Sequence, residues 1–149
     1  MERSIPVEAP KSLDNYRDSL TNHYSANVFY DALKREISFA KREGNQVGLV
    51  KFSLPSNVST EHLLYFANEL DLLVRQHDLI SRLSEREFVV MLRFDSEVSE
   101  ACESLIKRVK SVELRKFYHQ SLVADGTKGL AEVLVDLDNP QKLRSSKAK

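Results

Sequence analysis

The sequence lacks the features that mark several large classes of protein. Its 149 residues include one cysteine, Cys102, so no intramolecular disulfide can form, as is typical of proteins from a reducing cytoplasm. The 22 basic residues balance 22 acidic ones, so the net charge gives no general attraction to nucleic acid or to a membrane surface. No apolar run reaches the roughly 18 residues of a membrane span, and the first residues, MERSIPVEAPK, lack the apolar stretch of a secretory signal. We therefore expect a soluble, cytoplasmic protein that binds neither nucleic acid nor membrane.

Common catalytic and metal-binding motifs are also absent from the sequence. It contains no G-x-S-x-G motif, no P-loop and no Cys–His pair. The four histidines do not have the spacing of metal ligands, and each is expected to be a surface or partly buried polar side chain. These histidines are His23, His62, His77 and His119. The residues therefore indicate no metal site and no cofactor.

The sequence does contain enough apolar side chains for one folded domain. Hydrophobic residues make up 42% of the chain and charged residues 30%, as in ordinary globular proteins. A chain of 149 residues can bury a core without the help of a disulfide or a metal. We assign residues 1–16 to an N-terminal lead-in, residues 17–139 to the domain and residues 140–149 to a basic C-terminal tail.

Apolar periodicity predicts an alternation of helices and strands. The stretch 87–94 is apolar on both faces, so its strand is expected to lie in the middle of a sheet. Ser59 or Thr60 is expected to cap the second helix, and Asp125-Gly126 gives the signal of a hairpin between the last two strands. The predicted helices cover 24–42, 61–75 and 98–109, and the predicted strands cover 47–54, 79–83, 87–94, 117–124 and 130–135. This order predicts an α/β fold with helices packed on one mixed central β-sheet.

Three short motifs follow one another along the domain. Residues 18–21 read D-S-L-T and are followed by Phe29 and Leu33 on the first predicted helix. Residues 78–82 read D-L-I-S-R, and residues 84–88 read S-E-R-E-F. In order and spacing they resemble the D-x-L-T, D-x-x-x-R and G-G-D-E-F motifs of the GGDEF family, the diguanylate cyclases. The resemblance implies a nucleotide-cyclase palm-like fold and a place in bacterial cyclic di-GMP signalling.

The resemblance also indicates that metal ligands are missing. In the family, an Asp at the end of the first strand and the acidic third residue of the signature hold the divalent metal. The metal assists the attack of a ribose 3′-hydroxyl on an α-phosphate. Ser53 stands at the first of these positions and Arg86 at the second. A hydroxyl and a cation thus replace two carboxylates, and we expect Arg86 to repel the metal.

The signature has lost its two glycines as well. Ser84 and Glu85 stand in their place, where their side chains would crowd the nucleotide, and the charge of Glu85 would repel phosphate. The loop after the first strand is shorter than in the family and lacks its F-K-x-x-N-D and G-H-x-x-G-D elements. Glu87 and Phe88 are retained, but Phe88 is explained as a core residue and Glu87 as a solvated charge at a strand start. We therefore expect a degenerate signature with no catalytic residues.

A ligand-binding motif of the family is present in outline. Some GGDEF domains bind their product at an inhibitory R-x-x-D motif five residues before the signature, and Arg75 and Asp78 stand at this offset. A guanidinium can donate two parallel hydrogen bonds to guanine or phosphate, and a carboxylate can accept from the N–H edge of guanine. The alternative interpretation is structural, with Arg75 favoured by the helix dipole and Asp78 capping the turn into the next strand. Cyclic di-GMP bound as an intercalated dimer usually needs a further arginine, and the candidates are Arg82, Arg86 and Arg93.

The sequence thus supports two functional hypotheses of different classes. The first is a catalytically inactive regulatory module that acts through protein–protein contact, with an unidentified partner protein or as a homodimer. The alternative is a cyclic di-GMP receptor that binds its ligand through Arg75 and Asp78. A residual nucleotide-processing enzyme is the least favoured hypothesis.

Overall fold

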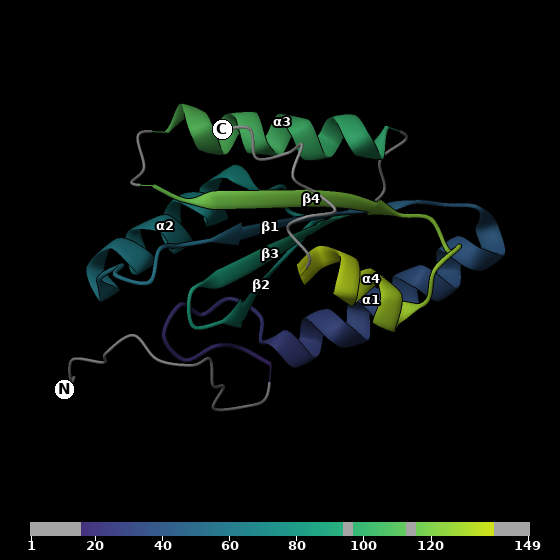
Figure 1. Cartoon of the computed structure of the whole chain (residues 1–149), viewed down its shortest axis with the longest axis horizontal. Coiled ribbons are helices and arrows are strands. Elements are labelled where there is room, and N and C mark those ends of the chain that lie inside the picture. Colours follow the sequence, from purple (N-terminus) through teal and green to yellow (C-terminus); the bar gives the residue numbers. More distant parts are fainter. Residues whose placement is uncertain (1–15, 94–96, 113–115, 139–149) are drawn as a thin grey trace.

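The computed structural model of the chain describes residues 16–93, 97–112 and 116–138. One four-stranded sheet lies between two pairs of helices, with α2 and α3 on one face and α1 and α4 on the other (Figure 1). In chain order the elements are α1 (Ala26–Glu43), β1 (Val47–Ser53), α2 (Thr60–Leu73), β2 (Leu79–Ser84), β3 (Glu87–Leu92), α3 (Val98–Ser111), β4 (Tyr118–Ala124) and α4 (Leu130–Asp138). The predicted α/β class, with helices packed on a central sheet, is confirmed.

The strands lie in the order β2-β3-β1-β4, and each neighbouring pair is antiparallel. The prediction of a mixed sheet is therefore wrong for the described strands, which have only one parallel contact, an isolated bridge between Tyr24 and Ser81. The physical reason is that β2 and β3 form a hairpin, while α2 joins β1 to β2 and α3 joins β3 to β4. Each helix connects two strands of the same direction, but one antiparallel strand lies between them in the sheet.

The central position predicted for β3 is confirmed. Phe88, Val90 and Leu92 point into the core formed with α2 and α3. Val89 and Met91 point into the second core, formed with α1 and α4. Because successive side chains of a strand alternate between faces, a strand that is apolar throughout can contribute to both cores.

The predicted helix ends follow from local hydrogen bonding. Ser25 begins α1, and its side chain accepts a hydrogen bond from the Val28 N–H at 3.4 Å. Gly44 ends α1 with a left-handed backbone at φ 75°, which glycine adopts without steric strain. Ser59 begins α2 and accepts from the His62 N–H at 3.1 Å, as one of the two predicted caps.

The prediction of a strand over 130–135 is wrong, because this segment is part of the helix α4. Over six residues the sequence LAEVLV is compatible with a strand or with a helix. The helical spacing of its apolar side chains continues to Leu137, and this longer pattern favours the helix. These side chains pack on the α1 side of the sheet, and they are Leu130, Val133, Leu134 and Leu137.

The predicted Asp125-Gly126 hairpin is wrong for a related reason. The Asp125 carboxylate accepts hydrogen bonds from the N–H and the hydroxyl of Thr127, at 3.1 and 2.7 Å, which turns the chain toward α4. Gly126 has φ 91°, and a Cβ placed there would lie 2.7 Å from the backbone nitrogen of Lys41. Close contact with the end of α1 thus requires a glycine at this position.

Two further sequence predictions concern the ends of the chain. Residues 1–15 of the predicted lead-in and residues 139–149, which include the predicted tail, lie outside the described residues. Within the described ranges, no helix combines the length and the apolar character that a membrane crossing requires.

We predict that Phe88→Ala lowers the free energy of unfolding by about 3–5 kcal/mol, as expected for a large-to-small change in a core. The Phe88 side chain is fully buried and contacts the rings of His23 and Phe66. Arg86→Ala, only two residues away in the half-buried turn, should cost less than about 1 kcal/mol. Urea unfolding of both variants measures the difference, and equal midpoints would contradict the placement of Phe88 in the core.

Candidate functional site

The end of β1 and the β2–β3 turn form one local site, as the motifs predicted. Ser53 pairs with Glu87 in the antiparallel register of β1 and β3. The Leu54 N–H donates to the carbonyl of Arg86 at 2.9 Å, which fixes the turn against the end of β1. The structure therefore brings together Ser53 and Arg86, the two residues that stand where the resemblance places metal ligands.

Lys51 is the residue of this site that the sequence analysis missed. Its side chain is 6% exposed, and its ammonium lies 2.8 Å from Asp138 Oδ1 and 3.4 Å from Glu87 Oε2. Glu87 also accepts a hydrogen bond from the Ser84 hydroxyl at 2.8 Å. The Glu87 side chain is 34% exposed, in agreement with a partly solvated charge, and its carboxylate also forms an ion pair with the buried lysine. A lysine inside the apolar run VGLVKFS was the signal that could have revealed the pair.

The residues of this site do not fit a divalent metal. Such ions prefer several oxygen ligands, mostly carboxylates. Here Ser53 offers a hydroxyl, Arg86 carries a positive charge, and the ammonium of Lys51 already occupies the space next to Glu87. In the part of the chain that the structure describes, no three His, Cys, Asp or Glu side chains gather as a metal site would require.

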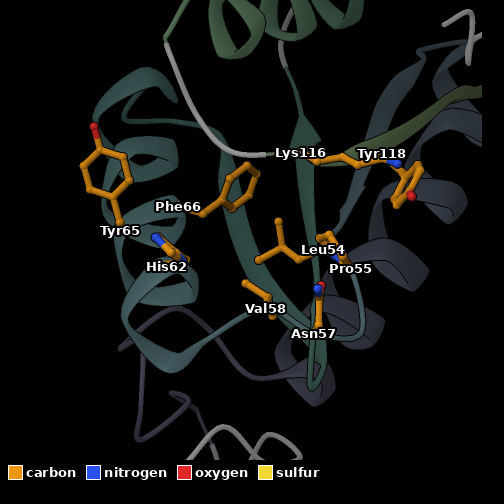
Figure 2. Close-up of a pocket in the computed structure, with 9 residues that line it drawn as sticks. All are labelled: Leu54, Pro55, Asn57, Val58, His62, Tyr65, Phe66, Lys116 and Tyr118. Atoms are coloured by element: carbon orange, nitrogen blue, oxygen red, sulfur yellow. The ribbon is translucent and has the colours of Figure 1, made fainter.

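A hollow of about 490 Å³ lies beside this turn, between the end of β1 and the start of α2. Figure 2 shows apolar side chains between α2 and the strands, with Lys116 and Tyr118 on the β4 side. The Lys116 ammonium lies 5.3 Å from the centre of the Tyr118 ring. No carboxylate is among the lining residues, which are Leu54, Pro55, Asn57, Val58, His62, Tyr65, Phe66, Lys116 and Tyr118. The described lining of the hollow therefore provides no carboxylate for a metal–triphosphate complex.

A buried ion pair connects the first motif to the second, and the same arginine also binds the turn of the third. Arg82 donates through Nη1 to both carboxylate oxygens of Asp18, at 3.1 and 3.2 Å, and both side chains are at most 1% exposed. Through Nη2, Arg82 also donates to the carbonyl of Glu85 in the turn, at 2.7 Å. Asp18 in turn accepts from the N–H and the hydroxyl of Thr21, at 2.8 and 2.9 Å. Arg82 is thus a structural residue, and its suggested role as a further ligand-binding arginine is wrong because it is buried.

Arg75 and Asp78, the predicted ligand-binding pair, bind each other. The Arg75 Nε and Nη2 donate to the two oxygens of Asp78 at 2.8 and 3.2 Å. Asp78 is fully buried and also accepts from the Arg93 N–H at 3.3 Å, whereas the Arg75 side chain is 37% exposed. The carboxylate therefore joins the segment after α2 to the end of β3.

A second hollow, of about 400 Å³, adjoins this pair. It lies between the N-terminal turn, α2 and the segment 75–78, and its lining residues include Arg17, His23, Asp71, Arg75 and Asp78. His23 is buried, which corrects its expected surface or partly buried position, and its Nε2 lies 3.9 Å from Asp71 Oδ1. Burial lowers the pKa of His23 below its usual value, although Asp71 and Asp18 act in the opposite direction.

Solved structures share this architecture. The GGDEF domain of FimX from Pseudomonas aeruginosa is 14% identical over 89% of this chain and 93% of its own, with a TM-score of 0.72. The GGDEF domain of DgcB from Caulobacter crescentus, in complex with cyclic di-GMP, is 16% identical over 86% of this chain and 88% of its own, with a TM-score of 0.68. The chain has the fold of a GGDEF domain.

A larger protein also contains a domain of this fold. The diguanylate cyclase SiaD from Pseudomonas aeruginosa, in complex with its activator SiaC, is 16% identical over 85% of this chain and 57% of its own, with a TM-score of 0.71. No protein-family model matches the sequence, and no curated protein matches it at a significant level. At these identities the likeness concerns the GGDEF fold, and the chemistry of the chain depends on its own side chains.

We predict that Asp18→Asn destabilises this GGDEF fold by about 3–5 kcal/mol, because it leaves the buried Arg82 guanidinium without a compensating charge. The asparagine keeps the shape of the side chain and an acceptor for Thr21. Adding Arg82→Met removes the buried charge, so the double variant should lose much less stability than the two single variants added together. Urea unfolding of the four proteins measures this coupling, and simple additivity would contradict the ion pair.

Proposed function

We propose that the chain is a catalytically inactive GGDEF-type regulatory module that acts through protein–protein contact. The observation that carries the proposal is that the ammonium of Lys51 lies between Glu87 and Asp138, beside the end of β1 and the turn where the resemblance places the metal ligands. The retained acid of the signature thereby has a structural partner of its own.

Several groups that cyclic di-GMP synthesis requires have no counterpart in this chain. Cyclic di-GMP synthesis requires metal held by carboxylates, and a backbone that the triphosphate can approach closely. Ser53 and Arg86 cannot supply the carboxylates, and the exposed side chain of Glu85 adds negative charge where phosphate would approach. These changes act independently, so restoring one of them would not restore the reaction.

Protein contact is the role that the remaining surface supports. Several large apolar side chains are exposed, among them Leu72 on α2 at 77%, Val135 on α4 at 62% and Tyr118 on β4 at 51%. SiaD, which has the same fold, was solved with a protein activator bound, so the fold is compatible with protein partners. The partner here is either another protein or a second copy of this chain.

We predict that the purified protein forms no cyclic di-GMP from GTP with Mg²⁺ or Mn²⁺. The reason is the absence of carboxylates from the positions of Ser53 and Arg86. Chromatographic separation of the nucleotides after incubation detects the product, with an active diguanylate cyclase as the positive control. Product above the level of an enzyme-free control would refute the proposal.

A second candidate function is a receptor for cyclic di-GMP. The specific observation is that Arg75 and Asp78 both line the hollow of about 400 Å³. Because the two side chains bind each other, a ligand would have to replace the bonds from Arg75 to Asp78 with bonds to guanine or phosphate. DgcB shows that a domain of this fold can hold cyclic di-GMP.

If the receptor function holds, Arg75→Ala should weaken cyclic di-GMP binding by about 1–3 kcal/mol, the range for loss of a bidentate contact to a base. Isothermal titration calorimetry gives the affinity, and Arg86→Ala, outside the hollow, is the matched arginine control. Substitution of Asp78 is unsuitable because the buried carboxylate also supports the fold. No heat change from the wild-type protein at excess ligand would eliminate this candidate.

A further inference from the structure

β4 is an edge strand of the sheet. It pairs with β1 along its whole length, from Val47 opposite Ala124 to Ser53 opposite Tyr118, without a register shift. Among the described residues, no strand pairs with its other side. Figure 1 shows β4 in front of the other strands, with α3 and α4 on opposite faces of the sheet. With respect to the described strands, β4 is therefore an edge to which another strand can add.

The opposite edge of the sheet is closed by the chain itself. The Tyr24 N–H donates to the carbonyl of Ile80 at 3.2 Å, and the Arg82 N–H donates to the carbonyl of Tyr24 at 3.0 Å. The Ser81 hydroxyl adds hydrogen bonds to the carbonyls of Tyr24 and Ser25, at 3.0 and 2.7 Å. The N-terminal segment thus covers β2, and a strand from outside can reach the sheet at β4.

β4 lacks the features that usually prevent edge strands from pairing. Soluble proteins protect such edges with charged side chains, proline or β-bulges. The sequence of β4, YHQSLVA, contains no charged residue and no proline, and its pairing with β1 is regular. Tyr118 is 51% exposed and Val123 is 36% exposed, so the strand also offers apolar surface.

We propose that β4 pairs antiparallel with β4 of a second copy of this chain, around a two-fold axis at Ser121. This inference rests on the proposed function and names its partner. The register places Tyr118 opposite Ala124, His119 opposite Val123 and Gln120 opposite Leu122. Every cross-strand pair is then uncharged, and the exposed Val123 and Tyr118 each gain a neighbour.

The charges that flank β4 favour this self-pairing. In this register Lys116, two residues before β4 of one copy, lies near the Asp125-Gly126 turn that follows β4 of the other. Both Lys116 and Asp125 are exposed. Hydrogen bonds from Thr127 lower the pKa of Asp125, so its carboxylate remains charged at neutral pH. Two-fold symmetry repeats the opposite-charge contact at both ends of the strand pair, and the association closes at two copies.

Multi-angle light scattering after size exclusion tests the pairing on the full chain over a range of concentrations. The wild-type mass should rise from 17.1 kDa toward twice that value. Ser121→Lys and Ser121→Glu each place like charges opposite one another at the axis, so each variant should remain monomeric where the wild type is dimeric. An equimolar mixture of the two variants should recover the dimer, because lysine then faces glutamate.

Leu72→Lys is the control, since Leu72 is the most exposed large apolar residue and lies on α2, away from β4. This variant should dimerise like the wild type, and thermal melting verifies that all variants are folded. A wild-type monomer at all concentrations, a dimer unaffected by both Ser121 variants, or no recovery in the mixture would overturn the inference. If the protein is monomeric and forms no cyclic di-GMP, only the β4 pairing is overturned. If it forms cyclic di-GMP, the proposed function is overturned, independent of the mass found by light scattering.

Discussion

The buried ion pair between Asp18 and Arg82 is the contact on which the arrangement around the β2–β3 turn depends. Arg82 holds the turn through the carbonyl of Glu85, and Asp18 holds the N-terminal turn through Thr21. The N-terminal turn leads directly to Tyr24, which covers the edge of β2. Because desolvation makes each charge costly alone, loss of one of the two residues should cost more stability than loss of both.

Fold and chemistry are separable in this chain, which has the fold of a GGDEF domain. Phe88 is part of one hydrophobic core, so the fold requires it independently of any chemistry at the β2–β3 turn. Glu87 has a different use in this chain, since it forms an ion pair with Lys51, whose other partner, Asp138, lies at the end of α4. On our proposal the ammonium of Lys51 lies beside the position at which the cyclase reaction needs a metal. Glu87 then serves the fold through this ion pair and no longer serves the reaction.

Patterns that act over short distances were predictable from the sequence, and contacts between distant segments were not. The two apolar faces of β3 predicted its central position, and Ser59 predicted the start of α2. The segment 130–135 was predicted wrongly because its six residues fit either period, and its tertiary packing decides for a helix. At the site, the motifs predicted that Ser53 and the turn meet. They did not predict the pairing of Lys51 with Asp138, because 87 residues separate the two in the chain.

On the proposed function, the ammonium of Lys51 takes up space next to Glu87 that a divalent ion would need. Titration with paramagnetic Mn²⁺ tests this arrangement. Mn²⁺ broadens the NMR signals of amides near its binding site, so titration into ¹⁵N-labelled protein with GTP present locates any bound ion. We expect no selective broadening at Ser53, Arg86 or Glu87, because the ammonium of Lys51 repels a cation beside Glu87. Selective broadening of these three signals at low Mn²⁺ concentration would contradict it.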